Sequence, residues 1–196
     1  MKAVFRVFLL VSAVLYIYPL IFTLFTSLRT SDDFYSDIWG LPRRLFFENY
    51  KTAFIDGHIG EYFLNSAVIA VIVLAVVLVL GMFSAYALAR LHVPFGNLIV
   101  AVLLVIQILP TESMILPLYM SMSGMDLFRV MYAPIVLAYI GWLLPPTIVI
   151  LRIFFLTIPS EILESARIDG SGEINTLFRI VMPLMGGAVA TCIVLD

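Results

Sequence analysis

Long apolar runs separated by short polar interruptions dominate the chain. Charged residues leave neutral stretches at residues 7–28, 62–89, 93–111, 130–151 and 180–195. A helix needs about 20 mainly apolar residues to cross the hydrocarbon core of a bilayer, so the first four stretches predict four complete spans. The last stretch predicts a partial span over 183–195, because a helix that begins near Pro183 rises only about 1.5 Å per residue. We therefore predict an all-α, polytopic membrane protein with a single transmembrane domain.

The composition agrees with this class. Hydrophobic residues make up 63% of the 196 residues and charged residues only 12%, a balance that excludes a soluble domain of this size. Membrane lipid is therefore the expected surrounding, and no nucleic-acid partner is expected.

Residues for enzymatic or metal chemistry are sparse. The two lysines, Lys2 and Lys51, are not preceded by the glycines of a phosphate-binding loop, so this chain is not expected to hydrolyse ATP. His58 and His92 have no second ligand or base at a productive spacing, and Cys192 is the single cysteine. We expect that this chain is not an enzyme and that it binds neither a metal ion nor a cofactor.

The most polar helical stretch reads IPSEILESARIDGSGEINTLFRIVMP and covers residues 158–183. Ser160 is a candidate N-cap, and Glu164 lies near the start of the helix, where negative charge is favoured. Gly170 is placed to end the helix in a left-handed conformation. The pattern therefore predicts a short helix over 160–169.

A second helix is predicted after this turn. Ser171 can cap it, and Pro183 limits its length. Its apolar positions recur at helical spacing and form one stripe: Ile174, Leu177, Phe178 and Val181. An interfacial helix pair in the lipid headgroups is one interpretation of the segment. The charges of the first helix argue against it, because they leave little apolar surface to insert.

The stretch ESARIDGSGEINTLFRIVMPL resembles the EAA loop of permease subunits of ABC importers. Five further stretches resemble the carbohydrate branch of these permeases, similar to the maltose-system inner-membrane permease family, and occur in the same order: LPRRLFFENYKTAF, YFLNSAVIAV, SAYALARLHVPFGN, ILPTESMILPLY and LRIFFLTIP. Ser165 departs from the family pattern, which has alanine there. The matching EAA positions are Glu164, Ser165, Ala166, Asp169, Gly170, Phe178, Ile180 and Pro183.

The resemblance implies a permease subunit of an ATP-driven, binding-protein-dependent importer of a sugar or oligosaccharide in a prokaryotic inner membrane. Its implied partners are a second permease subunit, a cytoplasmic ATPase dimer and an extracytoplasmic solute-binding protein. ATP and Mg²⁺ are expected on the ATPase. The loop that would couple to the ATPase covers residues 153–182, and its implied coupling residues are Glu164, Ser165, Ala166, Asp169, Gly170, Ser171, Phe178 and Pro183.

The orientation in the membrane follows mainly from the family's arrangement, which places the N-terminus and residues 153–182 in the cytoplasm and residues 30–60 outside. With alternating spans, the proposed cytoplasmic side carries six basic residues and the other side five. That difference is too small for the positive-inside rule to decide.

Two other functions stay open. A channel or secondary transporter places ionisable residues inside its spans, where they are costly and therefore functional. The neutral stretches contain none, and the nearest polar candidates are Gln107 and Glu112. An ABC permease for another solute, such as a polyamine, is the second alternative.

Aromatic and amide side chains are the candidates for substrate contacts. Sugar sites favour aromatic rings with amide partners, which makes Gln107, Tyr139 and Trp142 the candidates. Tyrosine and tryptophan near span ends also serve as interfacial belts.

The C-terminal end carries one further expectation. Asp196 would lie within the bilayer if a span begins at Pro183, and a charge there is costly. The family has a complete fifth span and a sixth, so we expect the sequence to be a C-terminally incomplete piece of a longer protein.

Overall fold

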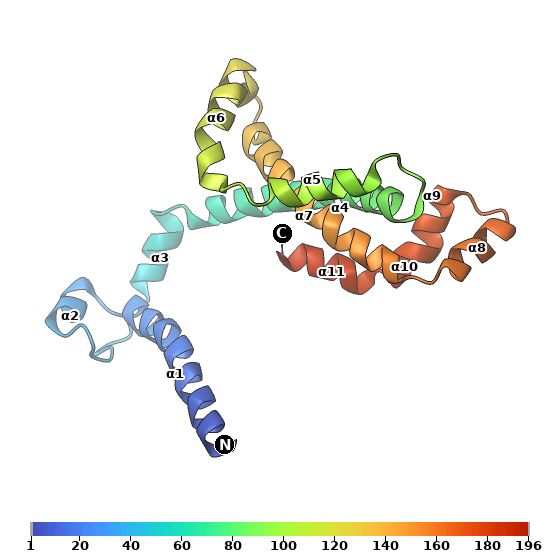
Figure 1. The fold of residues 1–196 in the computed structure, drawn as a ribbon. Helices are drawn as coiled ribbons and strands as arrows, with labels where there is room; N and C mark the ends of the chain where they lie inside the picture. Colours follow the sequence, from blue (N-terminus) through green and yellow to red (C-terminus); the bar gives the residue numbers. More distant parts are fainter. Residues whose placement is uncertain (1, 196) are drawn as a thin grey trace. The chain divides into compact units, whose positions relative to one another are not determined.

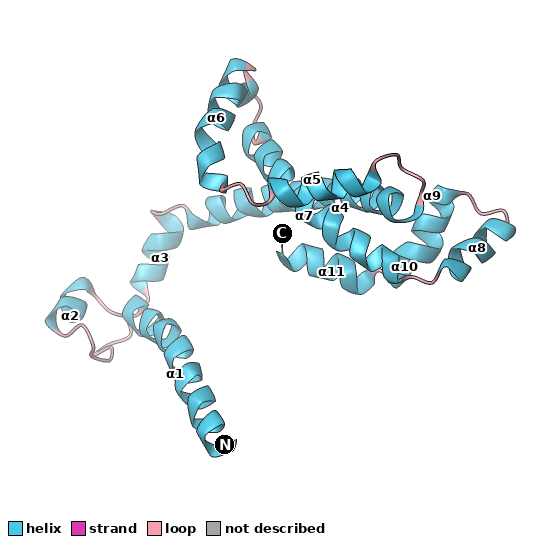
Figure 2. Ribbon diagram, viewed as in Figure 1, coloured by secondary structure: helices cyan, strands magenta, loops and turns pink. Residues whose placement is uncertain are grey.

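The computed structural model describes residues 2–195, so Asp196, on which the expectation of a charge within the bilayer depended, lies outside the described residues. Within that range the chain is built of helices joined by loops, without a strand, which confirms the all-α prediction (Figures 1 and 2). The structure divides into two compact units, Met1–Asn65 and Ser66–Asp196.

The first unit contains α1 (Lys2–Ser27), α2 (Ser31–Ser36) and α3 (Glu48–Ile55). Helix α1 is the first predicted span, and its apolar side chains point outward, as expected of a helix that lies in lipid. Thr30 is the N-cap of α2, and its hydroxyl accepts a hydrogen bond from the Asp33 amide at 3.2 Å.

The second unit begins inside α4 (Ile59–Arg90). The elements that follow are α5 (Gly96–Ile106), α6 (Thr111–Gly124), the 3₁₀ turn η1 (Leu127–Arg129), α7 (Ala133–Thr157), α8 (Ser160–Ile168), α9 (Glu173–Thr176), the π-helical stretch η2 (Leu177–Val181), α10 (Met182–Leu184) and α11 (Gly186–Leu195).

The core of the second unit joins α4, α7 and the C-terminal helices. Its central side chains include Leu151 and Phe155 of α7, both fully buried. Helices α4 and α7 cross closely at Gly81, where an added Cβ atom would lie 3.0 Å from Thr147 Cγ2. The ring of Tyr86 packs edge-on against Phe155 at 5.6 Å.

Within residues 2–195, three helices are long and apolar enough to cross a membrane: Val4–Ser27, Ile59–Arg90 and Ala133–Thr157. Two further pairs of helices pass the same criterion together but are bent, Gly96–Ile106 with Thr111–Gly124 by 99° and Glu173–Leu184 with Gly186–Leu195 by 78°. The structure therefore differs from one uninterrupted span over 93–111, because the helix stops at Ile106 and restarts after Pro110, which cannot donate a backbone hydrogen bond.

Candidate functional site

The EAA-like segment (residues 158–183) folds as the sequence predicts at its turn. Gly170 has φ +77°, which confirms the predicted left-handed residue. The Gly170 amide donates to the Arg167 carbonyl at 3.0 Å, and the Ser171 amide donates to the Ala166 carbonyl at 2.9 Å. These two bonds form a Schellman motif, which satisfies carbonyl groups that the end of α8 would leave without partners.

The two predicted serine caps are wrong. The N-cap position of α8 belongs to Pro159, and Ser160 is the first helical residue. The N-cap of the next helix is Gly172. The Ser171 hydroxyl instead accepts hydrogen bonds from Asn175 Nδ2 at 2.8 Å and Thr176 Oγ1 at 3.0 Å, so it holds the second helix through side chains.

Helix α8 has one buried and one exposed side. Leu163 and Ala166 are 5% and 4% exposed and pack inside this chain. Glu164, Ser165 and Asp169 are exposed. Ala166 is therefore separated from the carboxylates with which the sequence analysis grouped it, and its small side chain allows close packing within this subunit.

The predicted apolar stripe of the second helix is only partly buried. Leu177 and Val181 are 1% exposed each, whereas Ile174 is 68% and Phe178 is 44% exposed. The wider π-helical turn over Leu177–Val181 breaks the 3.6-residue period that defined the stripe. The Phe178 ring packs edge-on against Phe83 of α4 at 5.7 Å, and Pro183 lies inside α10.

Glu173 is a residue that sequence reasoning missed. Its Oε2 accepts a hydrogen bond from the Tyr86 hydroxyl of α4 at 2.7 Å. Its Oε1 accepts from Arg167 of α8, with an ion-pair distance of 2.9 Å. A single carboxylate therefore joins α4, α8 and α9.

Two arginines near the C-terminal ends of α4 and α7 bind main-chain carbonyl groups. Arg90, the last residue of α4, donates to Phe155 O, at 3.1 Å from Nε, and to Ile158 O at the end of α7. Arg152 of α7 donates to Leu88 O near the end of α4 at 3.3 Å. Cations at helix C-termini satisfy carbonyl groups that lack a partner in the helix, and they interact favourably with the helix dipole.

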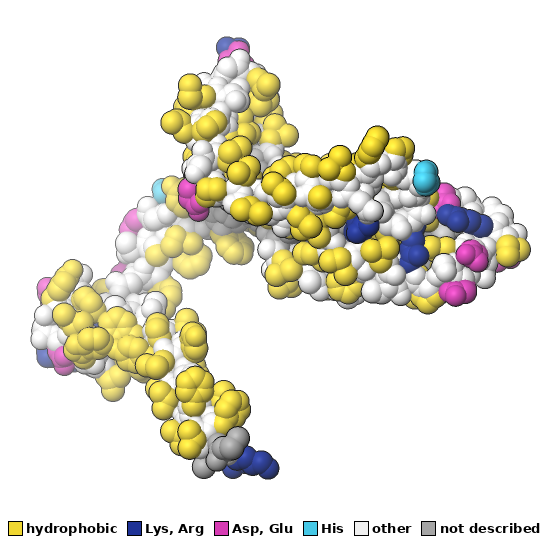
Figure 3. Space-filling model, viewed as in Figure 1, with side chains coloured by type: hydrophobic (Ala, Val, Ile, Leu, Met, Phe, Trp, Pro, Cys, Tyr) yellow, Lys and Arg dark blue, Asp and Glu magenta, His cyan; other side chains and the backbone are white. Residues whose placement is uncertain are grey.

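Charged side chains gather over α8 and α9, whereas hydrophobic side chains cover much of the face over α5 and α7 (Figure 3).

The substrate candidates lie around two cavities. Gln107 and Trp142 line one cavity of about 450 Å³ between α5, α6 and α7. Tyr139 lines a second cavity of about 420 Å³ that includes Ser66 and Ile193. The rings of Tyr139 and Trp142 meet edge-on at 6.0 Å, so neighbouring aromatic residues line the two cavities.

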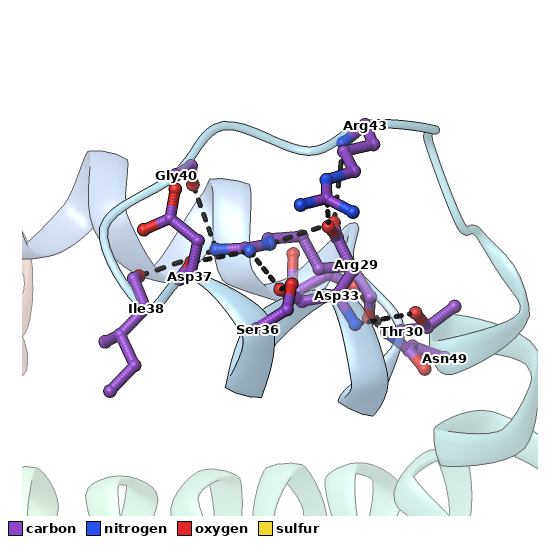
Figure 4. A network of polar contacts seen from close by, with 10 residues as sticks. Arg29, Thr30, Asp33, Ser36, Asp37, Ile38, Gly40, Arg43 and Asn49 are labelled. Atoms are coloured by element: carbon purple, nitrogen blue, oxygen red, sulfur yellow. Dashed lines mark hydrogen bonds and ion pairs between the residues drawn. The ribbon is translucent and has the colours of Figure 1, made fainter.

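The first unit contains a polar network that no sequence pattern indicated (Figure 4). The guanidinium of Arg29, 4% exposed, donates to the carbonyl oxygens of Asp33, Asp37, Ile38 and Gly40. Its Nε also donates to Asp33 Oδ2 at 3.1 Å, and Arg43 Nε lies 3.3 Å from Asp33 Oδ1. The hydrogen bond from Arg29 holds the pKa of Asp33 below its usual value, although burial partly opposes the shift.

Comparison with known proteins identifies the family. The family described as "Binding-protein-dependent transport system inner membrane component" matches residues 77–196. The diacetylchitobiose uptake system permease protein NgcG of Streptomyces coelicolor is 33% identical over 93% of this chain and 60% of its own length. The sulfoquinovosyl glycerol transport system permease protein SmoH of Agrobacterium fabrum is 31% identical, over 89% of this chain and 61% of its own length.

A third relative and one solved structure agree. The arabinooligosaccharides transport system permease protein AraQ of Bacillus subtilis is 31% identical over 96% of this chain and 68% of its own length. The crystal structure of a bacterial ABC transporter involved in the import of the acidic polysaccharide alginate shares the fold, with a TM-score of 0.82 at 20% identity, over 99% of this chain and 68% of the matched chain.

The chain spans about 60% of the length of NgcG and SmoH. The members of this family are inner membrane components of transport systems. The match confirms the prediction of an inner-membrane permease and the prediction that the chain is not an enzyme. This chain belongs to the family of inner membrane components of binding-protein-dependent transport systems.

Proposed function

We propose that the chain is part of the permease subunit of an ATP-driven importer for a sugar or oligosaccharide. The similar proteins are named for the transport of diacetylchitobiose, sulfoquinovosyl glycerol and arabinooligosaccharides, all of them carbohydrates or glycosides. The proposed partners are a second permease subunit, an ATPase pair that holds ATP and Mg²⁺, and an extracytoplasmic solute-binding protein.

The proposed coupling site is the exposed side of α8. One observation supports it most: the helix is fixed to its own subunit through Leu163 and Ala166, while the carboxylates of Glu164 and Asp169 remain exposed. A helix held in this way can pair with a basic groove on another protein and pass its movement to the membrane helices. This role places the EAA-like segment in the cytoplasm.

The proposed solute pathway passes the cavity lined by Gln107 and Trp142. The indole ring offers a flat apolar surface for a sugar ring, and the amide can bind hydroxyl groups. Gln107 Nε2 donates to Leu103 O at 3.1 Å, which fixes the orientation of the amide.

Glu164→Lys in the assembled transporter tests the coupling role. Charge reversal should reduce the ATPase that co-purifies with the permease roughly tenfold or more, because like charges at an interface cost several kcal/mol. Asp56→Lys is the matched control, since Asp56 is an exposed acid of the first unit.

Uptake of a panel of labelled sugars, with a polyamine included, identifies the solute class. Full ATPase binding and full sugar uptake by Glu164→Lys would contradict the coupling role, and uptake of the polyamine alone would contradict the sugar assignment.

A further inference from the structure

We propose that Tyr86 and Arg90 of α4 are positioning residues that make the EAA-like segment move as one body with α4 and α7. The proposal rests on the proposed coupling function of α8. It concerns how a displacement of that helix reaches the membrane-spanning helices.

The two residues share one face of α4. They are four positions apart, which places them one helical turn from each other. Both are in the last turns of the helix, and their partners lie on either side of α8 along the chain: Arg90 bonds to Ile158 before it, and Tyr86 bonds to Glu173 after it. Helix α4 is therefore linked to the chain on both sides of α8.

The first link holds the start of α8. Arg90 donates to the carbonyl groups of Phe155 and Ile158, where α7 ends, and Ile158 is only 8% exposed. Only Ile158 and Pro159 separate α7 from α8. The guanidinium thus fixes the point at which the chain leaves α7 and enters α8. Arg152 of α7 adds a bond from α7 to α4, because it donates to the Leu88 carbonyl.

The second link holds the end of α8. Arg167, in the last turn of α8, pairs with Glu173, and Glu173 accepts a hydrogen bond from the Tyr86 hydroxyl at 2.7 Å. Tyr86 is 4% exposed and packs against Phe155, so its hydroxyl has little freedom to move. A charge-assisted hydrogen bond in such a site is strong and directional.

The exposed carboxylates of α8 lie between these two links. A force on Glu164 therefore cannot tilt α8 alone without straining the bond of Arg90 to Ile158 before the helix or the bonds of Glu173 to Arg167 and Tyr86 after it. The links convert a movement of α8 into a movement of α4 and α7. Leu163 also packs in the core with Phe155, so without the links α8 would still move the spanning helices, but less completely.

Coupling in the assembled, reconstituted transporter tests the proposal through the number of solute molecules imported per ATP hydrolysed. Tyr86→Phe removes one hydroxyl and keeps the ring packing, so the complex should assemble while this ratio falls roughly fivefold, a typical coupling effect. Arg90→Gln should lower the ratio as well, and Arg90→Lys should restore part of it, because lysine keeps a cationic donor. Tyr62→Phe, in the exposed first part of the same helix, is the control and should not change the ratio.

The double variant Tyr86→Phe with Glu173→Gln distinguishes a shared link from two independent effects. It should be no worse than the more impaired of its single variants, because both substitutions break one link. An unchanged ratio in Tyr86→Phe and Arg90→Gln would overturn the proposal. A loss of assembled complex with an unchanged ratio in the remainder would also overturn it, since that indicates a merely structural role.

Glu164→Lys separates this inference from the proposed function. If it abolishes ATPase binding while Tyr86→Phe and Arg90→Gln keep the normal ratio, only the two-link proposal fails. If Glu164→Lys has no effect, the coupling function itself fails.

Discussion

Arg29 in the first unit and Arg90 in the second use the same chemistry over very different distances along the chain. Both donate to main-chain carbonyl groups. The acceptors of Arg29 lie four to eleven residues away, whereas those of Arg90 lie 65 and 68 residues away. Arg29 therefore organises one loop, and Arg90 connects two helices with the segment that follows them.

The difference in sequence distance predicts a difference in consequence. A local network can be lost while the rest of the chain keeps its structure, because its partners come from the same short segment. Loss of a long-range network changes how separate helices move together. The first is expected to appear as local unfolding and the second as a loss of coupling.

Arg29→Met should give the largest effect and remain local. Arginine has five N–H donors, and in this loop they donate to four main-chain carbonyl groups and to the side-chain carboxylate of Asp33. A buried acceptor left without a partner costs about 1–3 kcal/mol, so the loop over residues 30–47 should lose its order. Hydrogen exchange should accelerate there and stay unchanged in α8. Arg44→Met, at an exposed neighbouring position, is the control. Equal acceleration in α8 would contradict the local role.

Gly170→Val should give an intermediate effect, also local, within the second unit. The φ of +77° is unfavourable for a residue with a Cβ atom, by about 1–2 kcal/mol, and the β-branched side chain adds to the strain. Exchange of amides at the end of α8 should rise several-fold. Gly172→Val is the control, because Gly172 has φ −71° and open space around it. If both variants behave alike, the left-handed turn does not determine the end of α8.

The same contrast between local and distant partners explains what the sequence could predict. The spans at α1, α4 and α7 follow from apolar runs whose length the bilayer sets, and Gly170 follows from local backbone chemistry. The bond between Tyr86 and Glu173 joins positions 87 residues apart, so no local pattern contains it.

Two further features were beyond sequence reasoning. Apart from the Asp33 carboxylate, the acceptors of Arg29 are main-chain carbonyl groups, which every residue has, so no side-chain pattern marks them. The bend between α5 and α6 lies inside the neutral stretch 93–111, and hydropathy carries no information on the direction of a helix. Gln107 and Trp142 could be chosen as residue types, but their shared cavity depends on this bend.

The pH dependence of the Arg29 loop should give the smallest effect. Because the pKa of Asp33 is lowered in the folded loop, its contribution is complete above the usual value of 3.8 and is lost as the pH falls through the lower, folded value. The loop should therefore be unchanged from pH 7 to about pH 5 and loosen only below about pH 4. Trp39 reports on this loop, because its ring packs against Phe22 of α1 at 5.7 Å.

Trp142→Phe leaves Trp39 as the single tryptophan, since the chain has two, and its fluorescence can then be followed during acid titration. In the Asp33→Asn variant, the loosened spectrum should already be present at pH 7 and change little on acidification, because the carboxylate that binds Arg29 and Arg43 is gone. Asp32→Asn, at the exposed neighbouring acid, should keep the titration of the parent protein. A transition of unchanged midpoint and size in Asp33→Asn would show that other carboxylates control the loop. The low-pH transition would then carry no information on the Arg29 network.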